Sequence, residues 1–126
     1  YFTEANVLHM GDTYFNGLFP FIDLESGGSI DGLIGAVQQS LAIGDEATKT
    51  IPGHGPLASK DDLQAYHDML KTLRDRVADA VAEGKSLEQV VAAKPSAEFN
   101  ATANRFGFLT PDQFVTTIFN SVTATP

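Results

Sequence analysis

The stretch TIPGHGPLASKDDLQAYHDML, residues 50–70, holds the clearest structural signals in the chain. A short strand over residues 47–51 precedes an abrupt turn over residues 52–56, in which two glycines and two prolines surround His54. A long helix over residues 61–83 follows, because apolar residues recur there at helical spacing and a glycine stands directly after its predicted end. The stretch therefore predicts a strand that delivers a histidine to a tight turn, followed by a packed helix.

Upstream of this stretch, the sequence predicts one more strand and one more helix. Residues 5–10 form an apolar run that ends at Gly11, which is typical of a short buried strand. Residues 13–24 are aromatic-rich and interrupted by glycine and proline, which indicates a structured loop. Ser29 is a good N-cap for a helix that ends near Gly44. The order strand, helix, strand and then helices predicts an α/β fold.

Downstream, the chain is expected to be helical. SLEQ at residues 86–89 and TPDQ at residues 110–113 are capping boxes, which indicate the starts of two shorter helices. Residues 94–109 between these helices are expected to form a loop. The chain thus divides into residues 1–59, which hold the sheet and the two motifs described below, and residues 60–126, which form a helical tail.

The charge of the chain limits its partners. Its 126 residues carry a formal net charge of −8 and include no cysteine. Residues 1–63 hold nine acidic and two basic side chains, a net of −7, together with nine of the 11 glycines. Neither nucleic acid nor an anionic membrane surface is an expected partner, because phosphate binding needs clustered Lys and Arg. Excess carboxylate beside flexible loops suits a cation site, and a solvated acidic surface explains the charge equally well.

The first residues indicate that a longer protein is involved. The chain starts at Tyr1 rather than Met, and no basic segment precedes an apolar one, so no signal peptide is visible. No apolar run approaches the roughly 20 residues of a membrane span. We expect a chain that starts in mid-protein, and the sequence does not distinguish a cytoplasmic from a periplasmic location.

Two motifs carry possible chemistry. Asp12 stands just beyond the first predicted strand, and His54 stands in the Pro-Gly-His-Gly-Pro turn, where the flanking glycines allow close backbone approach. Taken alone, each has a simpler interpretation, as an exposed loop carboxylate and as a surface histidine. His9 is set aside, because alternation along a continuous strand places His9 and Asp12 on opposite faces. His67 is interpreted as a helix-surface residue.

Together and in this order, the motifs resemble one family. The segments Gly11-Asp12, NGLFPFID (16–23), GGSIDGLI (27–34) and the stretch at 50–70 are similar to the C-terminal half of hydrolases with the metallo-β-lactamase fold. The likeness covers residues 5–75. It continues more loosely through GKSLEQVVAA (84–93) and GFLTPDQFV (107–115), a tail found in some bacterial members.

The resemblance implies both a fold and a reaction. Residues 1–126 would be the C-terminal part of a metallo-β-lactamase-like domain, that is, one sheet with its helices from an αββα sandwich, followed by a helical tail. The family centre holds two metal ions, usually zinc; Asp12 would bridge both metals as a catalytic residue, and His54 would bind the second. The metals hold a hydroxide that cleaves a small-molecule β-lactam, ester or thioester.

One departure from the family pattern changes the expectation. The family also uses a His-x-His-x-Asp-His motif and a further histidine upstream, and this chain has neither. A zinc site generally takes three or four protein ligands, so we expect an inactive fragment whose two zinc ions are held only in the intact parent. The uncovered sheet predicts self-association or pairing with the missing N-terminal half. The alternative is a stand-alone, non-catalytic remnant that serves as a self-association or partner-binding module.

Weaker candidates for substrate contact also follow from the sequence. They are Tyr14, Asn16, Asp23 and Gly28. The first three follow Asp12 in the predicted loop, where a structural role for the neighbouring Phe15, Phe19 and Phe21 is the stronger interpretation. Gly28 precedes a helix whose N–H groups are suited to an anionic substrate group, and simple helix capping explains the same segment.

Overall fold

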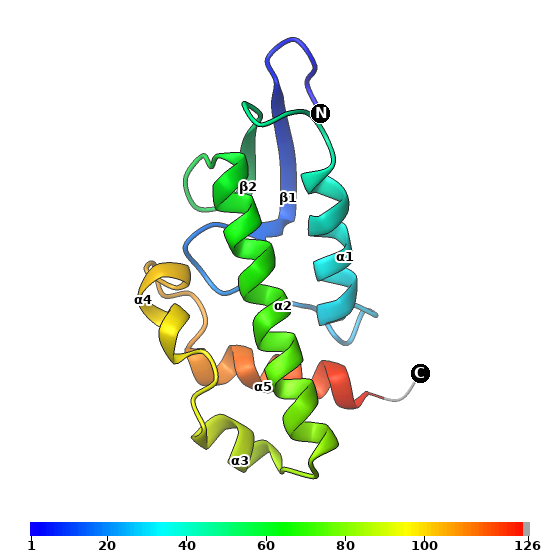
Figure 1. Ribbon diagram of the computed structural model, residues 1–126, viewed down its shortest axis with the longest axis vertical. Coiled ribbons are helices and arrows are strands. Elements are labelled where there is room, and N and C mark those ends of the chain that lie inside the picture. Colours follow the sequence, from blue (N-terminus) through cyan, green and yellow to red (C-terminus); the bar gives the residue numbers. More distant parts are fainter. Residues whose placement is uncertain (125–126) are drawn as a thin grey trace.

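The structure, a computed structural model, describes residues 1–124 and is a mixed α/β fold with a small parallel sheet (Figure 1). The elements in chain order are β1 (Val7–Phe15), α1 (Ile30–Leu41), β2 (Lys49–His54), α2 (Lys60–Ala82), α3 (Leu87–Ala92), a 3-10 helix (Ala97–Phe99), α4 (Asn100–Ala103) and α5 (Pro111–Thr123). The predicted order of strand, helix, strand and then helices is confirmed. Every helix within residues 1–124 is too short or too polar to cross a membrane.

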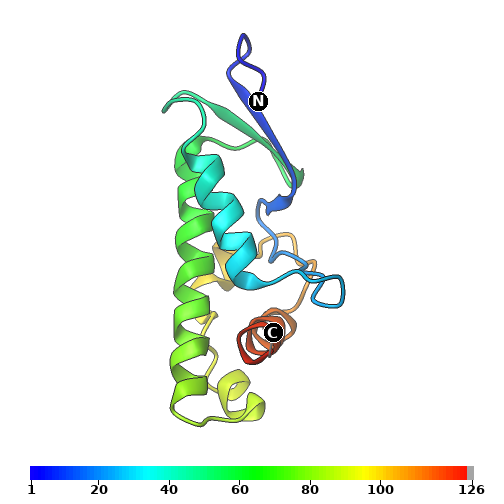
Figure 2. The same ribbon diagram turned by 90° about the vertical axis from the view of Figure 1, so that its right-hand side faces the viewer.

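The sheet consists of β1 and β2, which pair as parallel strands with α1 between them in sequence. Parallel neighbours need such a crossover, because the chain has to return to the same end of the sheet. Leu8 and Met10 are buried while His9 is exposed, as strand alternation requires. Figure 2 shows α1 and α2 on one side of the two strands, and no described helix or strand on the other side. One face of the sheet is therefore packed and the other is open.

The long helix α2 organises the apolar core. Its residues Leu63, Leu70 and Val77 are completely buried. It packs against α1 and β2 and also against α5, which lies across the lower part of the molecule in Figure 1. Phe19 stacks on Phe114 with ring centroids 4.8 Å apart, which ties the loop after β1 to α5. A single core thus joins residues from the first and last parts of the described chain.

Helix starts follow the sequence signals closely. Ser29 caps α1 by accepting a hydrogen bond from a backbone N–H, and the capping boxes at residues 86–89 and 110–113 both form. A further capping box pairs Ser59 with Asp62 at the start of α2, which the sequence analysis did not predict. Caps are local contacts, so the sequence alone predicts them well.

Three predicted boundaries are wrong. β1 continues past Gly11 to Phe15, β2 continues through Pro52 to His54, and residues 94–109 contain the 3-10 helix and α4 rather than a loop throughout. The strands are longer because their pairing persists beyond the glycines, with Phe15 and His54 as partners. Pro52 is compatible with β2 because an edge strand leaves one side of its backbone without ladder partners.

Two predicted side-chain environments are also wrong. Phe21 is 58% exposed, whereas Phe15 and Phe19 are buried. His67 is more buried than a helix-surface residue, because only 12% of its side chain is exposed. It lines a small pocket between α1 and α2, together with Arg74 and Asp31, which form an ion pair of 2.9 Å. Helical spacing identifies one buried face, whereas α2 is covered on more than one side.

Candidate functional site

Asp12 and His54 lie side by side on neighbouring parallel strands. Nε2 of His54 is 3.4 Å from Oδ1 of Asp12, and the two side chains are 52% and 80% exposed, respectively. Both are within reach of solvent and of any ligand that approaches this part of the sheet. The structure thus brings together the two residues that the sequence analysis predicts to bind metal.

A bulge in β1 presents Asp12 to solvent. The strand register shifts on both sides of Gly11, whose φ of 56° lies in the left-handed region that favours glycine. Regular alternation would place Asp12 on the packed face with Leu8 and Met10. The Thr13 hydroxyl donates to the Met10 carbonyl at 2.8 Å and fixes this irregular segment.

The same bulge removes the argument that set His9 aside. His9 and Asp12 are both exposed, whereas regular alternation along β1 would place one of them on the packed face. The Nδ1 of His9 accepts a hydrogen bond from the Gly11 N–H at 3.1 Å, and within residues 1–124 no ion pair joins His9 to Asp12. His9 lies near the pair in sequence but is engaged with its own backbone.

Two glycines make the close approach possible. A Cβ on Gly53 would collide with Oδ1 of Asp12 and with the carbonyl of Gly11. Gly55 has a φ of 97°, and a Cβ there would collide with the carbonyl oxygen of Asn16. The two glycines of the Pro-Gly-His-Gly pattern are therefore needed for the close packing of this turn against Gly11, Asp12 and Asn16, as well as for the turn itself.

The imidazole of His54 is held from two directions. Its ring stacks on Phe15 with centroids 4.6 Å apart and an interplanar angle of 17°. Phe108, from the segment before α5, lies nearly parallel to it at 6.4 Å. The Asn16 N–H donates to the His54 carbonyl at 2.9 Å, and the Asn16 side chain donates to the Pro56 carbonyl at 2.9 Å. These contacts fix the ring and its turn with Nε2 close to Asp12.

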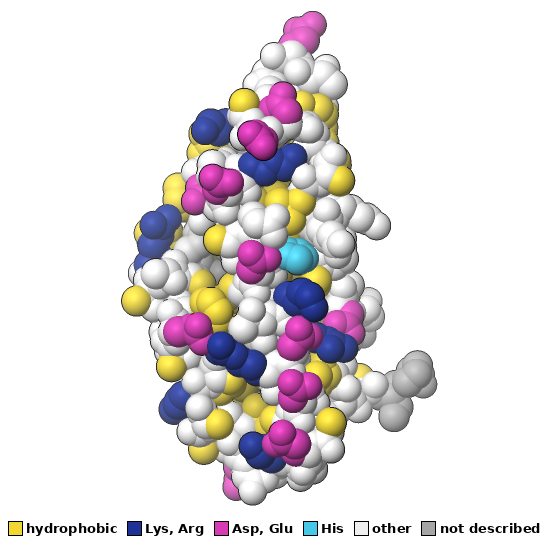
Figure 3. Space-filling model, viewed as in Figure 1, with side chains coloured by type: hydrophobic (Ala, Val, Ile, Leu, Met, Phe, Trp, Pro, Cys, Tyr) yellow, Lys and Arg dark blue, Asp and Glu magenta, His cyan; other side chains and the backbone are white. Residues whose placement is uncertain are grey.

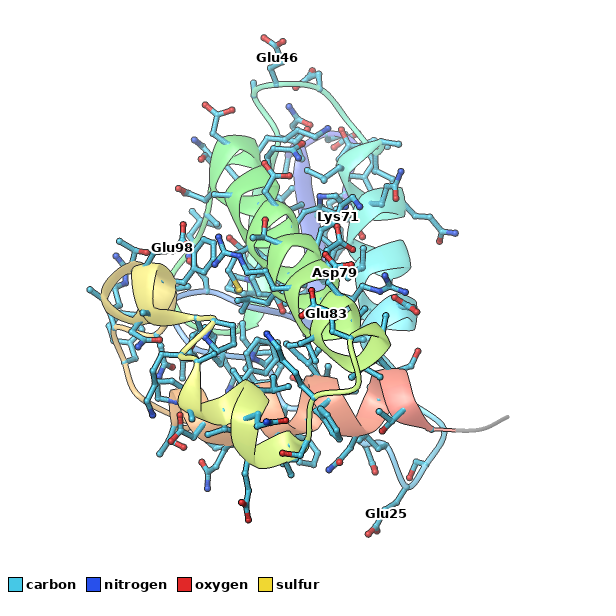
Figure 4. The ribbon with its side chains drawn as sticks, turned by 60° about the horizontal axis from the view of Figure 1, so that its bottom comes forward. Glu25, Glu46, Lys71, Asp79, Glu83 and Glu98 are labelled. Atoms are coloured by element: carbon cyan, nitrogen blue, oxygen red, sulfur yellow. The ribbon has the colours of Figure 1, made fainter. Side chains whose placement is uncertain are left out.

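Among the described residues, no further acidic side chain joins this pair to form a metal-binding group. Glu46 and Glu25, both from the acidic first half, lie at opposite ends of the molecule, and Glu98 projects from another side (Figure 4). Acidic and basic side chains are interspersed on the face shown in Figure 3, which includes α2. Within residues 1–124, the excess carboxylate of the first half does not gather into a group of three or more side chains that could hold a metal ion.

The weaker candidates fall into three different environments. Tyr14 is buried, with 1% exposure, and Asn16 acts on the His54 turn as described above. Asp23 accepts a hydrogen bond from the Ser26 N–H through its carboxylate, and its carbonyl accepts one from the Gly28 N–H at 2.9 Å. Asp23 and Gly28 therefore stabilise the loop before α1.

The N-terminus of α1 is occupied by protein groups. The Ile30 N–H donates to the Ser121 hydroxyl at 2.9 Å, and the Gly32 N–H donates to the Ser29 hydroxyl at 2.9 Å. These are the donors that an anionic substrate group would use. In the structure, the segment around Gly28 and Ser29 therefore serves to cap α1.

Phe15 and Phe108 are the residues that the sequence analysis missed as neighbours of the site. Phe15 stands three residues after Asp12 and was assigned a structural role within a loop. Phe108 comes from the far end of the chain, where the Phe106 N–H donates to the Gly17 carbonyl at 3.0 Å. No local pattern marks either residue, because both are placed by tertiary contacts.

The pair fits part of a metal site but not a whole one. Carboxylate oxygen and imidazole nitrogen are both common zinc ligands. Within residues 1–124, however, no group of three or more His, Cys, Asp or Glu side chains is arranged to hold a metal ion.

A scan of protein-family models and a search of curated proteins both find no match to the chain.

Proposed function

We propose that this chain is the C-terminal part of a metal-dependent hydrolase of the metallo-β-lactamase superfamily, in which Asp12 and His54 are two ligands of the metal centre. The observation that carries the proposal is the 3.4 Å approach of Asp12 Oδ1 to His54 Nε2 on paired strands. The motifs that supply these residues are the ones that resemble the family. The remaining ligands would come from outside residues 1–126.

The open face of the sheet supports the same proposal. In an αββα sandwich, each sheet has helices on one face and the other sheet on its second face. Figure 2 shows β1 and β2 with helices on one side only. The missing N-terminal half would pack on the other side, as a second sheet and a supplier of ligands.

Within the proposed site, each neighbouring residue has a definite task. A metal bound there would supply Lewis acidity for hydrolysis of a small-molecule β-lactam, ester or thioester. Phe15 and Asn16 orient His54, and Gly53 leaves room for the Asp12 carboxylate. These are positioning tasks, since none of the three contributes a metal ligand.

The first experiment is a zinc titration of the chain followed by NMR of its three histidines. We expect zinc to shift the ring signals of His54 and to be lost on desalting, because two ligands hold it weakly. Asp12→Asn and His54→Gln should remove the effect, and the matched control His9→Gln should retain it. Two zinc ions that stay bound through desalting would contradict the incomplete ligand set. A response of His9 or His67 alone would contradict the assignment of ligands.

The second experiment reads the coding sequence upstream of the Tyr1 codon. An in-frame His-x-His-x-Asp-His segment would establish the longer hydrolase, and a start codon directly before Tyr1 would contradict it. In the longer protein, Asp12→Asn or His54→Gln should abolish hydrolysis. Retained activity in either variant would contradict the roles proposed for these residues.

The open sheet face also supports a second candidate function, that of a non-catalytic self-association module. Ile51 lies on this face, between the buried Thr50 and Pro52, and it is partly exposed. If two copies pair through the sheet, sedimentation velocity should show a dimer that Ile51→Lys disrupts and that Glu88→Lys on α3 leaves intact. A monomer at all concentrations would exclude this candidate.

A further inference from the structure

A pocket of about 480 Å³ lies between the end of β1, the first half of α2 and the segment around α4. Its apolar lining includes Phe15, Leu57, Met69 and Phe99. Ligand pockets of proteins commonly occupy 300–1,000 Å³ and combine apolar walls with a few polar groups. The volume is therefore sufficient for a small organic molecule.

Two tyrosine hydroxyls beside this pocket lack hydrogen-bond partners. Tyr14 and Tyr66 both line the pocket, and they are 1% and 7% exposed. Their rings pack against each other with centroids 4.7 Å apart. Within residues 1–124, neither hydroxyl oxygen has a hydrogen-bond partner. Buried polar groups are nearly always paired, so two unpaired hydroxyls on one pocket indicate a ligand that would pair them.

The electrostatic surroundings define what kind of group would be recognised. Burial raises the pKa of both tyrosines, so each hydroxyl keeps its proton and can donate a hydrogen bond. Asp62 further raises the pKa of Tyr14 while Arg105 lowers it. For Tyr66, the Phe15 backbone lies near the hydroxyl and acts against the increase in pKa, without reaching the geometry of a hydrogen bond. Because Asp62 and Arg105 both line the pocket, their opposite charges offset each other and favour an uncharged ligand.

We propose that this pocket binds a small, uncharged molecule with an aromatic or branched apolar body and a carbonyl group that accepts hydrogen bonds from Tyr14 and Tyr66. Both hydroxyls are closed to solvent, so the carbonyl enters as a lining side chain shifts. Met69 and Arg105 are the long, flexible side chains of the lining. The proposal needs no metal, and it is independent of the hydrolase proposed above.

The test uses a matched pair of probes and the tyrosines themselves. Acetophenone and α-methylstyrene have nearly the same shape, and only acetophenone carries a carbonyl oxygen. The chain contains three tyrosines and no tryptophan. Carbon-13 labelling of tyrosine therefore gives two reporters in the pocket and one outside it, Tyr1, whose hydroxyl donates to Asn6.

We expect acetophenone to shift the ring signals of Tyr14 and Tyr66 and to leave Tyr1 unchanged. Its affinity should exceed that of α-methylstyrene by about tenfold, which is the effect of one or two net hydrogen bonds. Tyr14→Phe and Tyr66→Phe should lower this preference while both probes still bind, because the aromatic wall is retained. Tyr1→Phe is the matched control and should change nothing.

Three results would overturn the proposal. Equal affinity for the two probes would show that the hydroxyls do not recognise the carbonyl. Shifts confined to Tyr1, or no shifts at all, would show that the pocket does not bind such molecules. An unchanged preference in both Phe variants would assign the carbonyl contact to other residues. Binding of α-methylstyrene to the variants verifies that they remain folded.

Discussion

The α2–α5 end of the molecule and the β1–β2 end are built in different ways. At the first end, Leu73, Val77, Phe114 and Ile118 are completely buried in one core. At the second end, the sheet is packed on one face only. The side chains of the candidate metal ligands, Asp12 and His54, are exposed there, at the bulge in β1 and at the end of β2. Apolar burial is the main stabilising term in folding. The helical end therefore carries most of the stability, and the sheet end can carry chemistry at little cost to the fold.

The largest expected effect follows from replacing a core residue of α2. Leu73→Ala removes a side chain with no exposed surface and should lower the free energy of unfolding by about 3 kcal/mol. His9→Ala, on the open face of the sheet, should change it by less than about 0.5 kcal/mol. Urea denaturation measures both values. Similar losses in the two variants would contradict the proposed difference between the ends.

An intermediate effect is expected at the glycine next to the site. Gly53→Ala forces a Cβ against Asp12 and the Gly11 carbonyl, and should lower the free energy of unfolding by about 2 kcal/mol. It should also weaken the zinc-induced shift of His54. The control Gly35→Ala lies in α1 with free space around its Cβ position, and should raise stability by about 0.5–1 kcal/mol. A tolerated Gly53→Ala with unchanged zinc response would show that the close approach has no role.

A smaller effect of opposite sign is expected at the pocket. Tyr66→Phe removes a buried hydroxyl that has no hydrogen-bond partner, and should raise the free energy of unfolding by about 1 kcal/mol. Tyr1→Phe removes an exposed hydroxyl and should have almost no effect. Thermal unfolding measures the difference. A large loss of stability in Tyr66→Phe would mean that the hydroxyl is paired in solution.

The smallest effect concerns pH and the turn before β2. The pKa of Asp45 lies below its ordinary value of 3.8, mainly because the Asn6 side chain donates to it and also because of the Ala47 N–H. A lowered pKa in the folded state stabilises the turn above pH 4, and this contribution is lost as pH falls further. NMR titration of Asp45 should show the low pKa, and Asn6→Gly should raise it. Glycine is the suitable replacement because Asn6 has a φ of 53°. An unchanged pKa in that variant would contradict the assigned cause.

The sequence predicted those parts of the fold that depend on local contacts. Helix starts at Ser29, Ser86 and Thr110 form as predicted, because a cap involves only residues three or four positions apart. The ends of β1 and β2 were predicted less well. Gly11 indicates the end of a strand by its local preference, yet the strand pairing continues beyond it through a bulge. Pairing between distant segments can override local preference.

The candidate site shows the same division. Asp12 and His54 were identified from their motifs, and the structure places their side chains together. His67 was assigned to the surface, because the spacing of α2 does not reveal that α1 lies beside it and leaves only 12% of its side chain exposed. Phe108 and Tyr66 were not identified from the sequence, and Tyr14 was named there only as a weak candidate for substrate contact. The pocket that Tyr14 and Tyr66 share forms only when the tail packs against β1 and α2.

By itself, the sequence determined the α/β order of elements, the helix caps and the acidic charge, because these depend on residue types and short spacings. It also supplied the motifs of Asp12 and His54, whose role as metal ligands is what the family resemblance implies. Only the tertiary structure determined that a bulge at Gly11 exposes Asp12, and that the absence of a side chain at Gly53 leaves room for the Asp12 carboxylate beside His54. It also determined that two tyrosine hydroxyls lie unpaired beside one pocket. These features depend on contacts between segments that are tens of residues apart. Such contacts are set by how the whole core packs rather than by any local pattern.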